Sequence, residues 1–288
     1  MLREVGSNFI LKRPPNFRSP QTSSPDEVFF VEHLDMETRM TPAEKEPLLM
    51  PKPEDNGLVR TLNSMGTMTA APDIFSRAYI EFAPKAPGRS LEIGAAYGVA
   101  TLPALRSGAS VIANDIDERH LRILYDRVPA EHRARLELAA GEFPYKPDFP
   151  AGTLGAVLIC RVLHFFDGPR IERAAAKVLN WLAPGGKVFV VAETPYIGTA
   201  RAFFPTYESR QKAGAPWPGV VQNVAAHDPG RAGSLPSLFH LLDERVLGRV
   251  FTAAGFEIER AELFARPDYP ADIRLDGRES VGLIAVKK

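Results

Sequence analysis

The sequence has almost no cysteine and no long hydrophobic run. Its 288 residues include one cysteine, Cys160, so no internal disulfide can form, and we expect a reducing compartment such as the cytoplasm. No run approaches the roughly 18–20 apolar residues that a membrane-spanning helix needs, so we expect no membrane partner. The sequence also has no excess of charge of either sign, because 35 Lys and Arg residues balance 35 Asp and Glu residues. That balance gives no overall attraction for nucleic acid, which we do not expect as a partner.

The composition is otherwise that of an ordinary globular protein, with 45% hydrophobic and 24% charged residues. It suits one large domain with appendages or two small domains. Residues 1–56 are rich in Pro, Ser, Thr and charge, and we interpret them as an N-terminal extension that is partly disordered. Residues 57–288 are expected to hold the folded domain. Within 57–83, helical spacing predicts one or two helices, carried by Leu58, Leu62, Ile74, Ala78 and Phe82.

Short apolar runs and amphipathic segments alternate from residue 89 onward, at about 20–25 residues per unit. This alternation predicts βαβ units and a mainly parallel sheet that is buried on both faces. Only a loop joins the last two apolar runs, so they are expected to pair as an antiparallel hairpin. The expected strands are 89–94, 110–116, 134–140, 154–163, 187–194, 256–266 and 279–288, and the expected helices are 98–108, 118–128 (N-cap Asp117), 169–183 and 238–254 (C-cap Gly255).

Residues 194–237 interrupt this alternation and are rich in Pro, Gly and aromatic residues. A loop of this length inside a domain is usually functional or carries a small structure of its own. We expect an insert that caps the substrate pocket. The aromatic residues of this insert are Phe203, Phe204, Tyr207 and Trp217. They form either a lid over a flat or apolar substrate or a small satellite core under the loop.

A turn with few side chains follows the first expected strand. Gly94, Ala96 and Gly98 stand there, directly before a helix. Such a turn lets a ligand lie against the backbone above the N-terminus of the helix, at the sheet edge where ligands bind. A dinucleotide site would need a third small residue where Val99 stands, which disfavours a nicotinamide oxidoreductase.

The spacing E-x-G-x-A-x-G, from Glu92 to Gly98, resembles motif I of class I S-adenosylmethionine-dependent methyltransferases, whose middle position is usually Gly. The segments VIANDID, GEFPY, LGAVLICRVLHFF and LAPGGKVFV, and the terminal hairpin, resemble the same family at the expected spacing. The resemblance covers roughly residues 57–288. It implies an α/β, Rossmann-like, doubly wound seven-stranded sheet, mostly parallel with an antiparallel last strand, plus the N-terminal extension and an insert after the fifth strand.

The resemblance also implies S-adenosyl-L-methionine as cofactor. Asp115 would accept hydrogen bonds from the ribose hydroxyls and Glu142 from the adenine amine. Tyr97 either covers the cofactor or packs under the helix, and Arg161 contacts the cofactor carboxylate, the substrate or a surface acid. The expected cofactor contacts are Glu92, Gly94, Ala96, Tyr97, Gly98, Asp115, Ile116, Glu142, Phe143 and Arg161.

Methyl transfer from a sulfonium requires nucleophile, carbon and sulfur in line and water excluded. A general base is needed only if the nucleophile arrives protonated. His164 is the first candidate, although it also suits a structural role at the end of its strand, and Glu193 is the second. Weaker candidates are His227, Tyr196 and His240. We expect Cys160 to be a buried small hydrophobe rather than a nucleophile, and we expect no metal.

The sequence thus predicts methyl transfer to an O or N nucleophile of a small molecule. One alternative is a methyltransferase of a protein or peptide side chain, docked by the proline-rich extension. Another is a non-catalytic protein that binds a partner on the same fold. The absence of an NPPY-type motif after the fourth strand counts against the class that methylates exocyclic amines of bases or glutamine amides. Helices before the first strand can pair in this family, so a homodimer is compatible with the sequence.

Overall fold

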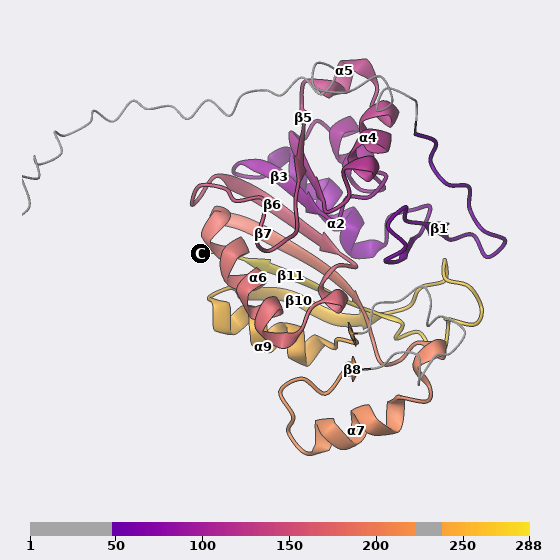
Figure 1. The fold of residues 1–288 in the computed structure, drawn as a ribbon. Helices are drawn as coiled ribbons and strands as arrows, with labels where there is room; N and C mark the ends of the chain where they lie inside the picture. The colour runs from indigo at the N-terminus through magenta and orange to yellow at the C-terminus, as the bar shows by residue number, and fades with distance from the viewer. Residues whose placement is uncertain (1–47, 223–237) are drawn as a thin grey trace, which may run out of the picture. The chain divides into compact units, whose positions relative to one another are not determined.

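A computed structural model describes residues 48–222 and 238–288. Its centre is a seven-stranded sheet in the order β10-β11-β7-β6-β3-β4-β5 (Figure 1). Neighbouring strands from β7 to β5 pair in parallel, whereas β11 runs antiparallel to both β7 and β10. The predicted α/β sheet and its terminal hairpin are therefore confirmed. The strands are β3 (Arg89–Ile93), β4 (Val111–Asp115), β5 (Leu136–Ala140), β6 (Leu154–Cys160), β7 (Leu182–Glu193), β10 (Glu257–Phe264) and β11 (Ser280–Val286).

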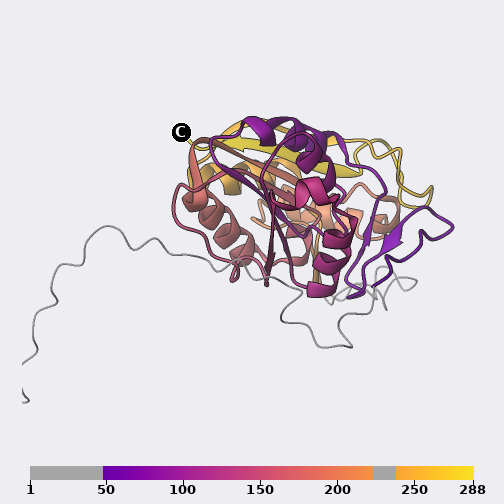
Figure 2. The ribbon, with the colours of Figure 1, turned by 90° about the horizontal axis from the view of Figure 1, so that it is seen from above.

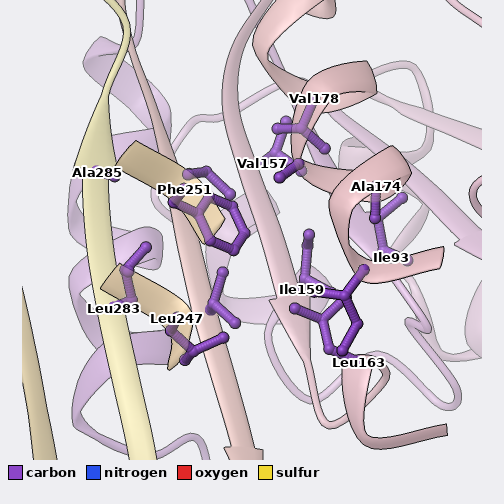
Figure 3. Packing of buried hydrophobic residues seen from close by; sticks show 14 of the residues in the cluster. Ile93, Val157, Ile159, Leu163, Ala174, Val178, Leu247, Phe251, Leu283 and Ala285 are labelled. Atoms are coloured by element: carbon purple, nitrogen blue, oxygen red, sulfur yellow. The ribbon is translucent and has the colours of Figure 1, made fainter. Parts of the chain in front are cut away.

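Helices cover both faces of this sheet (Figures 1 and 2). The core on one face joins the sheet to α6 (Gly168–Trp181) and α9 (Glu244–Ala254). Figure 3 shows Val157 and Ile159 of β6 in this core, together with Val178 of α6 and Phe251 of α9. The opposite core joins the sheet to α2 (Ile74–Phe82), α3 (Thr101–Arg106) and α4 (Glu118–Arg127). A short α5 (Ala130–Arg133) precedes β5.

Alternate side chains of one strand enter opposite cores, as the pleat of a β-strand requires. Val157 and Ile159 pack against α6 and α9, whereas Ala156 and Leu158 pack on the other face. All four are fully buried. The prediction of strands buried on both faces is confirmed for the central strand β6 but not for β5 and β10 at the two sheet edges, which are partly exposed. The layers leave the strand ends as the place for a site.

The predicted helix over Leu58 and Leu62 is wrong. This segment forms the hairpin β1 (Val59–Arg60) and β2 (Thr67–Met68). Turn chemistry prevails over apolar spacing here, because the Asn63 side chain accepts from the backbone N–H of Met65 and Thr61 closes the loop onto the carbonyl of Gly66. The helix predicted over the second half is present as α2, with Asp73 as its N-cap.

The helix predicted from residue 238 begins six residues late. Leu238–His240 forms β9, which pairs antiparallel with β8 (Val220–Gln222). The N-cap of α9 is Asp243, whose side chain accepts from the N–H of Val246, and its C-cap is Gly255 with φ 110° as predicted. Apolar spacing cannot reveal β9, because its partner strand lies in the insert.

Strand β6 ends at Cys160, three residues before the predicted end, because Arg161 adopts a left-handed conformation with φ 60°. A single 3₁₀ turn, η3 (Leu163–Phe165), follows. Helix α6 ends at Trp181, and β7 begins at once, since Leu182 already pairs with Leu154 of β6. Because β6 ends early, Arg161 lies just beyond the strand, at the carboxyl ends of the parallel strands, and is not part of the strand itself.

The insert after β7 carries its own structure, η4 (Gly198–Ala200), α7 (Phe204–Lys212) and β8. Phe203 and Tyr207 are buried in a small core with Ile197 and Ile273. Trp217 packs against Gly168 and His240 instead. Of the two predicted alternatives, a small satellite core therefore fits Phe203 and Tyr207 better than a lid does.

Two segments lie outside the described residues, namely 1–47 and 223–237. The second segment includes His227. Within the described residues, no helix is long and apolar enough to cross a membrane.

Candidate functional site

A cavity of about 550 Å³ lies at the carboxyl ends of the parallel strands. Its volume is typical of small-molecule sites. The strand ends supply Glu92, Asp115, Cys160 and Glu193, and the β1–β2 hairpin and the insert complete the wall. Ten of the residues predicted from the sequence line this cavity: Glu92, Gly94, Ala96, Asp115, Ile116, Glu142, Phe143, Arg161, His164 and Glu193.

The turn after β3 needs a residue without a side chain at its first position. Gly94 has φ 72°, and a Cβ atom there would lie 2.5 Å from Cγ2 of Val162. Ala96 also has a positive φ, 43°, which costs a non-glycine residue roughly 1–2 kcal/mol. Its N–H donates to Oδ2 of Asp115 at 2.9 Å. The turn therefore presents bare backbone to the cavity and is tied to the end of β4.

Tyr97 and Gly98 lie behind the turn instead of in the cavity wall. The Tyr97 ring is buried, and its hydroxyl donates to the carbonyl of Arg60 and accepts from the N–H of Leu62. Gly98 has φ 85° and packs closely against Leu124 of α4. Of the two alternatives for Tyr97, the structure places it in the packing, where it fixes the β1–β2 hairpin to the turn.

Asp115 is buried and held on both oxygens. Oδ2 accepts from Ala96, and Oδ1 accepts from the N–H of Asp117 at 3.0 Å. Oδ1 is also 3.0 Å from Nδ1 of His120, whose Nε2 accepts from the N–H of Leu62 at 3.0 Å. The His120 ring therefore links the end of β4 to the backbone of the β1–β2 hairpin. The carboxylate keeps acceptor capacity while its orientation is fixed.

Glu92 is a buried carboxyl group at the end of β3 that accepts a hydrogen bond from the Thr101 hydroxyl. Burial raises the pKa of Glu92 to about 7, with the nearby Asp115 carboxylate adding a smaller increase. Near neutral pH the group is thus balanced between its two protonation states, and a cationic ligand would favour the charged one.

The rim beyond β5 carries Glu142, which is half exposed and pairs with Nη2 of Arg170 at 2.9 Å. Phe143 beside it is buried. Ile116, directly after Asp115, exposes 50% of its surface, which is unusual for a large apolar side chain beside a cavity. This part of the wall thus offers an apolar face next to acidic groups.

A second polar cluster lies at the ends of β6 and β7. Nη2 of Arg161 is 3.0 Å from Oε1 of Glu193, and the same oxygen accepts from the Tyr269 hydroxyl at 2.7 Å. Arg266 donates to that hydroxyl at 2.8 Å and makes two parallel bonds to Asp268 at 3.0 and 2.8 Å. Among the described residues, Nε and Nη1 of Arg161 and Oε2 of Glu193 are buried without a hydrogen-bond partner. Such unpaired groups cost about 1–3 kcal/mol each unless something satisfies them.

His164 lines the cavity but is a weak base. Its ring stacks on Phe239 at 4.7 Å and meets the edge of Phe165. Burial, with a smaller effect of the Arg161 charge, lowers the pKa of His164 well below its ordinary value. The ring is therefore neutral at neutral pH.

The other candidates lie elsewhere. His240 is buried beside Trp217, with Nδ1 3.1 Å from the carbonyl of Phe166, and Tyr196 packs on Tyr207. Burial raises the pKa of the Cys160 thiol, which contacts Asp73. This keeps the thiol protonated, as expected of a structural cysteine. No group of three or more His, Cys, Asp or Glu side chains within 48–222 and 238–288 could hold a metal ion.

Sequence reasoning missed His120, Arg266 and Tyr269. His120 stands in an amphipathic helix with no feature that marks it. Arg266 and Tyr269 come from the loop between β10 and β11, far from any motif. One signal was available, because three charged or aromatic residues of "FARPDY" directly follow β10, which ends at the same edge of the sheet as Glu193; they are Arg266, Asp268 and Tyr269.

Comparison with known proteins agrees with this geometry. Residues 91–186 match a family model described as "Methyltransferase domain". No curated protein matches the chain in sequence. An S-adenosylmethionine-dependent methyltransferase from Mesorhizobium loti is similar in structure, with a TM-score of 0.52 at 18% identity over 73% of this chain and 96% of that one. One from Methanosarcina mazei has a TM-score of 0.52 at 18% identity over 72% and 96%.

A glycopeptide N-methyltransferase, MtfA, in complex with S-adenosylhomocysteine has a TM-score of 0.50 at 20% identity, over 76% of this chain and 88% of that one. At such identities the likeness shows the fold alone. The predicted fold and the predicted resemblance to the family are confirmed.

Proposed function

We propose that this chain, whose residues 91–186 match a methyltransferase-domain model, transfers a methyl group from S-adenosyl-L-methionine to an oxygen or nitrogen nucleophile of a small molecule. One observation carries the proposal. Two buried carboxyl groups, Glu92 and Asp115, flank a bare backbone turn in the same cavity as a second, separate polar cluster. A cofactor half and an acceptor half in one cavity are what a group transfer between two ligands requires.

The residues around β3, β4 and β5 fit the cofactor. The turn at Gly94 lets a ligand approach the backbone, since this residue lines the cavity and carries no side chain. Asp115 keeps acceptor capacity on Oδ2 for a ribose hydroxyl, and Ile116 offers an exposed apolar face for a purine ring. Glu142 and Phe143 stand where the adenine edge would lie. Glu92, with a pKa of about 7, provides negative charge near a cationic ligand.

When bound, the cofactor supplies a methyl group that is already activated by a positive sulfur. The chain then has to orient the nucleophile, exclude water and, for a hydroxyl or ammonium, accept a proton. Glu193 suits that last role better than His164. Its Oε2 is unpaired among the described residues, whereas burial keeps the His164 ring a weak base.

Methylation of a peptide side chain is the second candidate. The fold of a glycopeptide N-methyltransferase is similar to that of this chain, but at 20% identity this likeness does not indicate which substrate this chain takes. A cavity of about 550 Å³ has the volume of a small-molecule site, and this favours a whole small molecule over one side chain of a large partner.

Calorimetric titration with S-adenosylmethionine and S-adenosylhomocysteine tests the proposal. We expect micromolar binding of both and none of NADH. Asp115→Ala should weaken binding tenfold or more, about 1.4 kcal/mol. Asp126→Ala, which removes an exposed carboxylate from the same stretch of chain on α4, is the matched control and should bind as the wild type does. If neither sulfur ligand binds, the chain is not a methyltransferase, and a non-catalytic binding role replaces this proposal.

A further inference from the structure

The polar cluster of Arg161 and Glu193, at the ends of β6 and β7, has both a hydrogen-bond donor and a hydrogen-bond acceptor without a partner among the described residues. Nε and Nη1 of Arg161 are donors without a partner among the described residues, and Oε2 of Glu193 is an acceptor in the same condition. All three atoms are buried, and both residues line the cavity. Because proteins rarely leave buried polar groups unpaired, a ligand group that both accepts and donates is the natural partner.

This cluster lies on the acceptor side of the cavity. Strand β6 has β3 on one side and β7 on the other, and the Arg161 guanidinium pairs with Glu193 at the end of β7. Tyr269 flanks it, with the guanidinium carbon 5.2 Å from the ring centre. The turn at Gly94 and Asp115 belong to β3 and β4, on the other side of β6. The contacts of Arg161 thus favour the substrate over the cofactor carboxylate.

The chemistry of the pair selects among acceptor groups. A carboxylate would satisfy Arg161 but face the Glu193 carboxylate, and an ammonium would satisfy Glu193 but face Arg161. A neutral hydroxyl accepts from Arg161 and donates to Glu193. A primary amide could do the same, but its nitrogen lone pair is delocalised and is a poor nucleophile. The hydroxyl is the group that satisfies both residues and also reacts.

Building on the methyltransferase function proposed above, we propose that the acceptor is an acidic hydroxyl, a phenol or an enol on a flat apolar ring. Arg161 and Glu193 hold this hydroxyl, and Glu193 takes its proton. The hydroxyl must be acidic because a carboxylate is too weak a base for an alcohol. The ring fits the adjoining wall, where Phe165, Phe203 and Phe239 line the cavity.

The step balances in atoms and charge. The acceptor oxygen forms its bond to the methyl carbon as the carbon–sulfur bond breaks, and that electron pair stays on sulfur, which becomes a neutral thioether. The hydroxyl proton moves to Oε2 of Glu193 and from there to solvent. The Arg161 charge stabilises the oxygen as negative charge develops on it. Tyr269 and Arg266 are positioning residues, because Tyr269 donates to Oε1 of Glu193 and Arg266 donates to the Tyr269 hydroxyl, which leaves Oε2 for the acceptor.

Binding of 4-nitrophenol tests this inference without the cofactor, because its phenolate absorbs visibly and reports the protonation of the bound probe. We expect saturable binding. Arg161→Met should weaken it about tenfold and raise the pKa of the bound phenol, since the stabilising cation is gone. Glu193→Gln should lower that pKa, since the opposing negative charge is gone. A merely structural role for the pair predicts no such opposite shifts.

The exposed pair Arg89 and Glu137 is a matched control. Arg89→Met and Glu137→Gln should leave probe binding unchanged. If Arg161→Met does not fold, Glu193→Gln decides alone, and a bound-phenol pKa that does not fall overturns the proposal. Lack of saturable 4-nitrophenol binding overturns it as well, as does tighter binding of 4-nitrobenzoate, which would assign Arg161 to an acid.

Titration of the same variants with S-adenosylmethionine separates the two proposals. We expect Arg161→Met and Glu193→Gln to bind it as the wild type does. Failure of the wild type to bind it counts against the methyltransferase function, while probe binding still reports on the acceptor cluster. Loss of cofactor binding in Arg161→Met alone would place Arg161 at the cofactor and overturn the acceptor proposal.

Discussion

Glu92 is a carboxyl group that the fold buries beside another one. Its pKa lies at about 7, above the ordinary value of 4.5, mainly because burial disfavours the charged form. Between these two pH values the folded chain holds a proton that the unfolded chain has lost. The stability that this proton contributes is complete below about pH 4.5 and is lost as the pH rises through about 7.

Glu92→Gln removes this dependence. Relative to the variant, the wild type should lose up to about 3 kcal/mol of unfolding free energy between pH 4.5 and pH 8. Urea unfolding of both proteins at the two pH values measures it. A constant difference between the two proteins would show that Glu92 is charged in the folded state throughout.

Local sequence patterns predicted the site residues at the ends of β3 and β4. They did not predict the site residues beside β7, at the other end of the cavity. Glu92, Gly94 and Asp115 follow apolar strands at fixed spacing, so their place at the sheet edge is written in the sequence. Arg266 and Tyr269 reach Glu193 only because β11 inserts between β10 and β7. That contact depends on the pairing of strands distant in sequence, which no local pattern contains.

At the scale of elements, α2 packs onto β11 through one glycine. A Cβ atom on Gly282 would lie 2.1 Å from the ring of Phe75, a fully buried residue of α2. Gly248 in the middle of α9 is the opposite case, since nothing lies within 4 Å of its would-be Cβ atom. The two glycines therefore respond oppositely to the same added methyl group.

Gly282→Ala should destabilise the protein by about 1–3 kcal/mol, because the Phe75 ring has to move in a packed core. Gly248→Ala should stabilise it by about 0.5–1 kcal/mol through helix propensity. Thermal or urea unfolding measures both. Equal effects of the two substitutions would contradict the packing of α2 on β11.

Strong local signals predicted elements well. Asp117 and Gly255 cap their helices as expected, because capping depends on the cap residue itself. The β1–β2 hairpin and β9 were not predicted, since two- and three-residue strands carry too few side chains to show a period and depend on their partners.

At the scale of the whole molecule, the site depends on the sheet edge and on what closes it. Leu48 and Met50 pack against the cluster around Tyr97, which fixes the turn, and Glu54 pairs with Arg60 at the cavity wall. The described chain from residue 48 therefore contains each residue to which a role is proposed here.

Deletion of residues 1–47 should leave both S-adenosylmethionine and 4-nitrophenol binding unchanged, as calorimetry and absorbance would measure. Loss of either would contradict a self-sufficient cavity. If both ligands still bind but transfer to a peptide substrate is abolished, the extension docks that substrate, and the peptide alternative gains support.

A crystal structure with S-adenosylhomocysteine tests the division of the cavity most directly. We expect a ribose hydroxyl at Asp115, the purine beside Ile116, and no contact between the ligand and the Arg161–Glu193 pair. A ligand carboxylate bound to Arg161, or a ligand outside this cavity, would contradict it.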